Sequence, residues 1–279
     1  METWTWVFLL GGLGLAGGGL GCAAGKHTDE RLPAGVERVT LTDASGRATL
    51  PYLRAGPRDA PRVIFVHGTP GAAANYLAYL AEPPAGVEVV SVDRPGFGQS
   101  PRDDPASLTF AGQAAALGPL LVERGGRWPV LVGHSLGGPI VCRAAADRPG
   151  RVGGLVVLAG SVDPELERPR WYNVLGAVPP LPWLLPGSLR RANDEVFAAP
   201  RQTRELAGVL GGVACPVVVV QGGRDRLVPP GNADYLLDHL PNAASVSVDL
   251  IAEAGHFLPW WHEDAVRRAI AEVSAKAWK

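Results

Sequence analysis

Short apolar blocks alternate along most of the chain with amphipathic blocks and with turns rich in Gly and Pro. Aliphatic and β-branched runs of strand length predict strands at 37–42, 48–54, 62–66, 87–92, 129–133, 154–159, 216–221 and 245–250. Apolar positions spaced three and four residues apart predict helices at 72–81, 107–124, 136–147, 231–240 and 261–277. Because near-continuous apolar strands that alternate with helices are typical of parallel sheets covered on both faces, we predict a doubly wound α/β fold with a mainly parallel eight-stranded sheet.

One interval interrupts this alternation. Residues 161–213 contain no strand pattern and combine clusters of Pro and Trp with a helix-like segment at 188–210. Since the interval follows the sixth predicted strand, we predict a small helical cap inserted over the carboxyl ends of the strands, where open α/β sheets bind ligands. The core of the fold then comprises residues 36–160 and 214–279.

The N-terminal segment predicts export. Residues 7–21 are uncharged but too few for a transmembrane helix, and they fit the apolar region of a signal peptide. The segment ends in Gly-Leu-Gly-Cys at 19–22, which resembles the lipobox of bacterial lipoproteins, in which the cysteine is acylated. We therefore expect a leader at 1–22, a flexible linker at 23–35, and an exported protein that is periplasmic or attached to the membrane through lipidated Cys22. An uncleaved N-terminal anchor is the alternative.

Charge and cysteine content narrow the function classes. The formal net charge is −1, and no run of Lys or Arg marks a face for polyanions, so nucleic acid is not an expected partner. We expect Cys142 and Cys215 to be buried free thiols, with no disulfide framework.

The strongest chemical signal is Gly-His-Ser-Leu-Gly at 133–137, directly after a predicted strand and before a predicted helix. Such a sharp turn needs small flanking residues, and it projects the serine hydroxyl toward the positive end of the following helix. We therefore predict that Ser135 is a nucleophile, which requires a base and a group that orients the base.

Two loops after later strands supply these groups. His256 follows the last predicted strand and precedes an aromatic run, and we predict that it is the base. Asp225 lies in the Gly-rich turn after the strand at 216–221, and we predict that it is the acid; Asp163 is its rival. The chain order Ser, Asp, His is the order found in α/β hydrolases.

With these residues in place, the chain resembles the α/β-hydrolase superfamily from about residue 36 to residue 277. His-Gly-Thr-Pro-Gly at 67–71 is similar to its oxyanion loop, and Asp-Arg-Pro-Gly-Phe-Gly-Gln-Ser at 93–100 is similar to a structural loop of the family. The resemblance implies that the backbone N–H groups of Thr69 and Leu136 form the oxyanion hole, that His67 shapes the loop, and that no metal or organic cofactor is needed.

The branch of the family remains open at this point. Ser135 argues against epoxide hydrolases and haloalkane dehalogenases, which use Asp as the nucleophile, and we expect an esterase or lipase acting on a small-molecule acyl substrate. Carbon–carbon bond hydrolases, haloperoxidase-like enzymes, peptidases of the proline-iminopeptidase kind and a non-catalytic surface lipoprotein are the alternatives. Aromatic residues that we predict to line an acyl pocket are Trp171, Tyr172, Trp183 and Phe257.

Overall fold

The computed structural model describes residues 32–101 and 109–279. The fold is that of the compact unit Pro33–Lys279. The predicted leader, Cys22 and most of the predicted linker lie outside the described residues. Among the helices of the described residues, none is both long and apolar enough to span a membrane.

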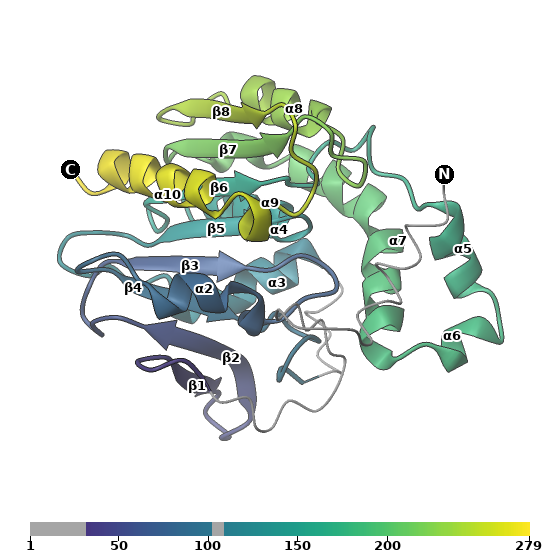
Figure 1. Ribbon diagram of the computed structural model, residues 1–279, viewed down its shortest axis with the longest axis horizontal. Helices are drawn as coiled ribbons and strands as arrows, with labels where there is room; N and C mark the ends of the chain where they lie inside the picture. The colour runs from purple at the N-terminus through teal and green to yellow at the C-terminus, as the bar shows by residue number, and fades with distance from the viewer. Residues whose placement is uncertain (1–31, 102–108) are drawn as a thin grey trace. The chain divides into compact units, whose positions relative to one another are not determined.

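The described residues form one eight-stranded sheet in the order β1-β2-β4-β3-β5-β6-β7-β8 (Figure 1). Its strands are β1 Glu37–Thr42, β2 Ala48–Ala55, β3 Arg62–Val66, β4 Glu88–Val92, β5 Val130–His134, β6 Gly154–Leu158, β7 Val217–Gly222 and β8 Val246–Ile251. The pairs β1–β2 and β2–β4 are antiparallel, and every other neighbouring pair is parallel. The predicted fold class is therefore confirmed, and the carboxyl ends of β3 to β8 share one edge of the sheet.

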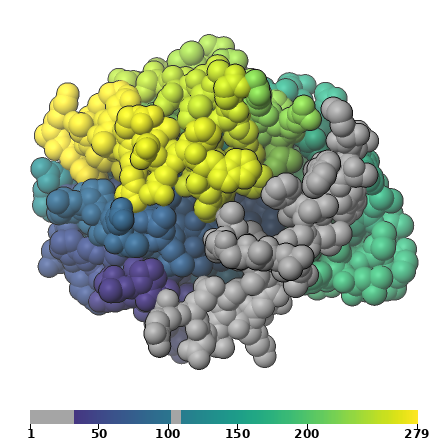
Figure 2. Space-filling view, viewed as in Figure 1, coloured from purple at the N-terminus to yellow at the C-terminus, as the bar shows by residue number. Residues whose placement is uncertain are grey.

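Helices connect the strands. They are α2 Leu77–Ala81, α3 Phe110–Ala116, α4 Gly137–Asp147, α5 Trp171–Ala177, α6 Leu181–Leu184, α7 Gly187–Ala207, α8 Gly231–His239, α9 Leu258–Trp261 and α10 Glu263–Ala277. The prediction of one helix over 107–124 was too long, because α3 ends before the Gly118–Pro119 pair and only a 3-10 turn follows. Figure 2 shows the C-terminal segment in yellow as a continuous part of the face in view.

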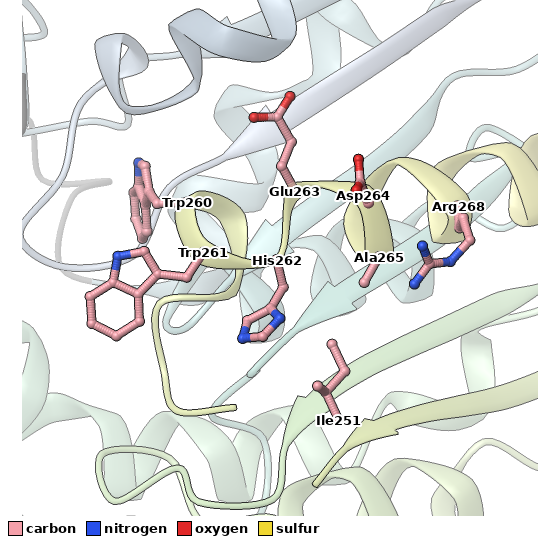
Figure 3. A pocket seen from close by; sticks show the side chains of 8 residues that line it. All are labelled: Ile251, Trp260, Trp261, His262, Glu263, Asp264, Ala265 and Arg268. Atoms are coloured by element: carbon pink, nitrogen blue, oxygen red, sulfur yellow. The ribbon is translucent and has the colours of Figure 1, made fainter. Parts of the chain in front are cut away.

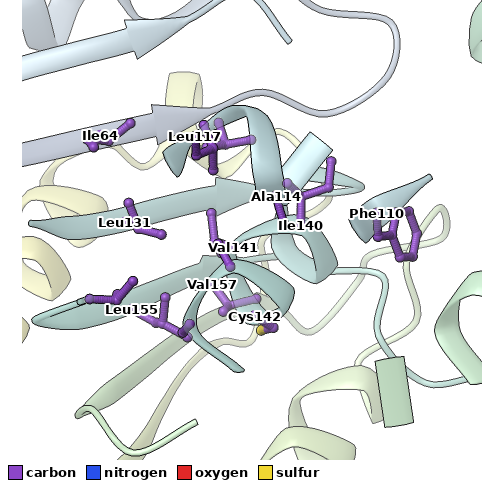
Figure 4. Packing of buried hydrophobic residues seen from close by; sticks show 14 of the residues in the cluster. Ile64, Phe110, Ala114, Leu117, Leu131, Ile140, Val141, Cys142, Leu155 and Val157 are labelled. Atoms are coloured by element: carbon purple, nitrogen blue, oxygen red, sulfur yellow. The ribbon is translucent and has the colours of Figure 1, made fainter. Parts of the chain in front are cut away.

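The hydrophobic core lies between the sheet and the helices packed on it. Figure 4 shows Phe110 and Ile140 from α3 and α4 on the side of the sheet that presents Ile64, Leu131 and Leu155. The core strands β3 to β6 are buried along their whole length, as expected for parallel strands covered on both faces. The free thiol of Cys142 is buried as predicted, whereas that of Cys215 is only partly buried.

Residues 161–213 form helices α5, α6 and α7 and a short 3-10 turn, without a strand. In Figure 1 these helices lie beyond the arrowheads of the parallel strands. We call residues 161–213 the cap insertion. Helix α7 is anchored to the core by buried side chains, while α5 and α6 bury none of their residues. The first part of the insertion is therefore the more solvent-exposed one.

A buried ion network holds the opposite end of the sheet. The carboxylate of Glu88, at the start of β4, is 2% exposed and lies 2.6 Å from the side chains of Arg54, Arg62 and Arg124. Charges taken out of water need such partners, because removal of one partner leaves the others buried and uncompensated. The network therefore belongs to the stability of the sheet and lies away from the carboxyl ends of its strands.

Candidate active site

The nucleophile candidate occupies a strained turn between β5 and α4. Ser135 has a φ of 55°, which is unusual for any residue except glycine and raises the energy of the turn. The turn is also tightly packed, because a Cβ atom added to Gly137 would lie 2.1 Å from the carbonyl oxygen of Val66. Backbone strain and packing thus place the Ser135 side chain at the carboxyl edge of the sheet, at the N-terminus of an 11-residue helix.

The base candidate and the acid candidate form a pair at the same edge. His256 Nδ1 lies 2.8 Å from Asp225 Oδ2, and the Asp225 side chain is fully buried. The other carboxylate oxygen, Oδ1, accepts hydrogen bonds from the backbone N–H groups of Leu227 and Val228 at 2.8 and 2.9 Å. These bonds hold the carboxylate toward the imidazole, so that Nδ1 carries the proton and Nε2 is left as the basic nitrogen.

Asp163, the rival acid, faces other groups. Its backbone N–H binds the side chain of Asn232, and its carboxylate accepts a hydrogen bond from the backbone of Glu165. Among the described residues only Asp225 forms an ion pair or hydrogen bond with His256 Nδ1. Within those residues the Ser135 hydroxyl forms no hydrogen bond, and base catalysis by His256 would require one between Ser135 Oγ and His256 Nε2.

The histidine of the nucleophile motif has a different position. His134 Nε2 lies 2.9 Å from the carbonyl oxygen of His256 and donates a hydrogen bond to it, since a carbonyl oxygen can only accept. The centroids of the His134 and His256 rings lie 4.8 Å apart. The ring of Trp260 packs edge-on against that of His134, with centroids 5.4 Å apart. Burial, and secondly the neighbouring His256, lowers the pKa of His134 from 6.5 to about 3. His134 is therefore a neutral side chain that holds the backbone of the base.

The predicted oxyanion loop lies directly against the nucleophile. A Cβ atom added to Gly68 would lie 2.8 Å from Ser135 Cβ and 3.4 Å from Ser135 Oγ, so only glycine fits there. Within the described residues the backbone N–H of Thr69 donates to no protein acceptor, and its buried hydroxyl is also unpaired. The loop therefore presents unpaired donors beside the serine hydroxyl.

The comparisons with known proteins agree with this geometry. The profile described as "Alpha/beta hydrolase family" matches residues 63–272, which is more than half of the chain. The chain belongs to the alpha/beta hydrolase family. The match includes the loop at 67–71, Ser135, Asp225 and His256, and it confirms the resemblance predicted from the sequence.

Proteins that are similar to the chain are named for different activities. A putative carbamate hydrolase RutD from Pseudomonas savastanoi is 26% identical over 229 residues, covering 71% of this chain and 87% of its own. A 2-hydroxy-6-oxononadienedioate/2-hydroxy-6-oxononatrienedioate hydrolase from Paraburkholderia xenovorans is 26% identical over 284 residues. This match covers 85% of the present chain and 94% of the relative. The structure of a Paleococcus ferrophilus monoacylglycerol lipase matches with a TM-score of 0.62 and 22% sequence identity. This match covers 81% of the present chain and 99% of the lipase chain. Because the lipase shares only 22% of its sequence with this chain, this match shows a common fold and nothing about activity.

The aromatic residues predicted to line an acyl pocket are spread over two regions of this hydrolase. In the cap insertion, Trp171 and Trp183 are 57% and 73% exposed, and Tyr172 packs edge-on against Trp171. Phe257 contacts the His256 ring edge-on, with the ring centroids 5.7 Å apart. Both tryptophans of the insertion are therefore solvent-exposed, and their predicted role in an acyl pocket stays a prediction.

A pocket of about 660 Å³ lies beside the segment that follows His256. Figure 3 shows that it is lined by side chains from the end of β8, from α9 and from the start of α10. None of Ser135, Asp225 or His256 lines it. The pocket is therefore distinct from the space above the nucleophile.

The structure also reveals site residues that the sequence analysis missed. Arg94, in the loop after β4, is fully buried beside the oxyanion loop and forms an ion pair with Glu195 of α7. Its neighbour Asp93 is a turn residue as predicted, with Oδ1 accepting from the backbone N–H of Ala73 at 2.7 Å. Partners about 100 positions apart produce no local pattern, so only the folded structure could identify the Arg94–Glu195 pair.

Proposed function

We propose that this hydrolase cleaves carboxylic esters through an acyl-enzyme, with Ser135 as the nucleophile, His256 as the base and Asp225 as the acid. The observation that supports the proposal most is the convergence of a strained serine turn and a buried His–Asp pair at one edge of the sheet. An unstrained surface serine would need neither the positive φ nor the tight glycine packing around it.

In the proposed first step, Ser135 Oγ attacks the acyl carbon while its proton moves to Nε2 of His256. The carbonyl π electrons move to the oxygen, which becomes the oxyanion of a tetrahedral intermediate. The backbone N–H groups of Thr69 and Leu136 stabilise this charge, and one such donor contributes about 2.7–4 kcal/mol to the transition state. The oxyanion electrons then re-form the C=O bond, the C–O bond to the leaving group breaks, and His256 protonates the departing oxygen. The acyl group stays on Ser135.

In the proposed second step, His256 takes a proton from water, and the resulting hydroxide attacks the acyl carbon. The C–O bond to Ser135 breaks, the serine oxygen regains the proton from His256, and the carboxylic acid leaves. Asp225 remains ionised in both steps and stabilises the imidazolium through the 2.8 Å contact with Nδ1.

The peptidase alternative needs acidic side chains that are free to bind an amine. Both carboxylate oxygens of Glu195 are engaged by Arg94, at 2.8 and 3.1 Å. Glu167 is mostly buried and its carboxylate binds the hydroxyl of Ser161, while burial raises the pKa of that carboxyl. Glu195 and Glu167 are therefore already engaged, whereas Glu165 and Asp194 of the same insertion are exposed, and the aminoacyl substrate in the panel below tests the peptidase alternative.

Carbamate cleavage is the second candidate. A relative at 26% identity is named a putative carbamate hydrolase, and its match covers 87% of its length. A carbamate carbonyl would meet the same nucleophile and the same oxyanion donors. The ester proposal and the carbamate proposal therefore differ in substrate recognition rather than in the triad.

Initial rates on a matched substrate panel test the proposal. The panel contains p-nitrophenyl acyl esters of graded length, a p-nitrophenyl carbamate and an aminoacyl p-nitroanilide. We expect ester turnover by the wild type, its loss in Ser135→Ala, and its retention in Ser45→Ala, which changes an exposed turn serine. Faster cleavage of the carbamate would favour the second candidate, and equal ester turnover by Ser135→Ala would contradict the assignment of the nucleophile.

We also propose that the protein is exported and attached to the membrane through Cys22. The support is the apolar leader and the lipobox-like sequence at 19–22. Cys22→Ser should move the protein from the membrane fraction to the soluble fraction. An unchanged distribution would favour the uncleaved N-terminal anchor.

A further inference from the structure

The guanidinium of Arg94 is held in one orientation by buried partners. Nη1 and Nη2 donate to the two carboxylate oxygens of Glu195, and the Arg94 and Glu195 side chains are 1% and 4% exposed. Gln113 of α3 accepts from Nη1 and donates to Glu195 Oε1 at 2.7 Å. Because the guanidinium is planar, this two-pronged ion pair fixes the directions of the remaining N–H groups as well.

One of those N–H groups points at the oxyanion loop. Arg94 Nη2 donates to the carbonyl oxygen of Gly68 at 2.8 Å. His67 Nδ1 lies 2.7 Å from the same oxygen. Both lone pairs of the Gly68 carbonyl are thus engaged by buried groups.

The hydrogen-bond network also assigns the His67 tautomer. The backbone N–H of Arg94 donates to His67 Nε2 at 3.2 Å, and the 2.7 Å contact between Nδ1 and the Gly68 carbonyl oxygen requires a proton on Nδ1, because a carbonyl oxygen can only accept. The longer 3.3 Å approach of Arg94 Nε to Nδ1 is then a packing contact rather than a hydrogen bond. Burial first, and the Arg94 guanidinium second, hold the pKa of His67 well below its ordinary value. His67 therefore stays neutral and donates to the Gly68 carbonyl.

The carbonyl of Gly68 and the N–H of Thr69 belong to one peptide unit. In a trans peptide the C=O and N–H bonds point in opposite directions, so anchoring the oxygen sets the direction of the N–H. Arg94 lies on the carbonyl side of this peptide, and the Cα of Gly68 lies against Ser135. A rotation of the peptide by half a turn would bring the carbonyl oxygen toward the substrate and break both anchoring bonds.

We infer that Arg94 and Glu195 are positioning residues that hold the Gly68–Thr69 peptide in the orientation that forms the oxyanion hole. This inference deepens the proposed function and rests on it, because the oxyanion hole matters only if Ser135 attacks a carbonyl. Since Glu195 belongs to α7, this role would make the cap insertion part of the assembly of the site.

The test removes both charges together. A single Arg94→Leu change would leave Glu195 buried and uncompensated, whereas replacement of a whole buried ion pair by apolar residues often preserves folding. The main variant is therefore Arg94→Leu/Glu195→Leu, and Arg94→Lys is the conservative variant because it retains a charged donor. Thermal unfolding confirms that each variant is folded.

The kinetic readout separates a disturbed oxyanion hole from a disturbed triad. We expect kcat for a p-nitrophenyl ester to fall about tenfold or more with KM nearly unchanged, since the lost interaction acts in the transition state. The thionoester analogue develops charge on sulfur, a poor hydrogen-bond acceptor, so its rate should fall much less. The matched control Asp225→Asn should slow both substrates by similar factors, and Arg94→Lys should recover part of the ester rate.

A crystal structure of the double variant provides a readout that does not depend on activity. We expect the Gly68–Thr69 peptide to be rotated or to occupy two orientations. An unrotated peptide, or an equal loss of ester and thionoester turnover, would overturn the positioning role. If the wild type hydrolyses no ester, the proposed function fails, and the peptide orientation in the crystal still decides whether Arg94 and Glu195 position the loop.

Discussion

His134 should make the stability of the protein depend on pH in a way that one substitution removes. The perturbation is His134→Gln, which keeps an N–H donor for the carbonyl oxygen of His256 but cannot titrate. In the folded protein His134 is neutral, because burial lowers its pKa to about 3. The unfolded chain takes up a proton near pH 6.5, so it binds more protons than the folded state between these values, and stability falls as the pH falls.

The size of the effect follows from the two pKa values. With a pKa of about 3 when folded and 6.5 when unfolded, this histidine lowers the unfolding free energy by about 2 kcal/mol between pH 7 and pH 5. Urea unfolding of wild type and variant, followed by far-UV circular dichroism, should give a variant curve that is flatter by this amount. Above pH 7.5 the difference should be constant, which is the internal control. Parallel curves from pH 7 to pH 5 would refute the assignment of His134 as a buried neutral residue.

Three further substitutions test other parts of the structure. Gly137→Ala puts a Cβ atom 2.1 Å from the Val66 carbonyl oxygen, so urea unfolding should show a loss of about 3 kcal/mol or more; wild-type stability would contradict the tight turn. Asp225→Asn should lower kcat by about 10³-fold to 10⁴-fold while Asp163→Asn changes it little, and the reverse result would move the acid. Glu88→Gln removes the carboxylate charge that Arg62 and Arg124 share, while Arg54 keeps its pair with Glu37, so unfolding should become easier by about 3–5 kcal/mol, and an unchanged urea midpoint would contradict the network.

Much of the fold could be predicted from the sequence because its signals are local. The valine-rich runs of β3, β5 and β7 are buried on both faces, and their unbroken apolar pattern differs from that of a half-exposed strand. Ser135 could also be identified from a local pattern. The strand and the helix around it approach so closely that only glycine fits at positions 133 and 137. The chain order of Asp225 and His256 then follows from the fold.

Other features depend on contacts between distant segments. The extent of α3 is an exception, because the Gly118–Pro119 pair is a local turn signal that the prediction of one helix over 107–124 overlooked. The aromatic residues of the cap insertion are equally apolar in a pocket and on a surface, and the structure places Trp171 and Trp183 on the surface. Pairing of Arg94 with Glu195 requires α7 to fold back over the sheet edge, which no short window of sequence contains.

The most direct test of the central proposal is labelling with a fluorophosphonate probe, followed by mass spectrometry of the digested protein. A phosphonyl adduct forms only on a serine that has an active base, because the hydroxyl must lose its proton to displace fluoride. We predict one adduct, on the peptide that contains Ser135, and none in Ser135→Ala. An unlabelled wild type, or an adduct that persists in Ser135→Ala, would contradict the assignment of Ser135 as the nucleophile.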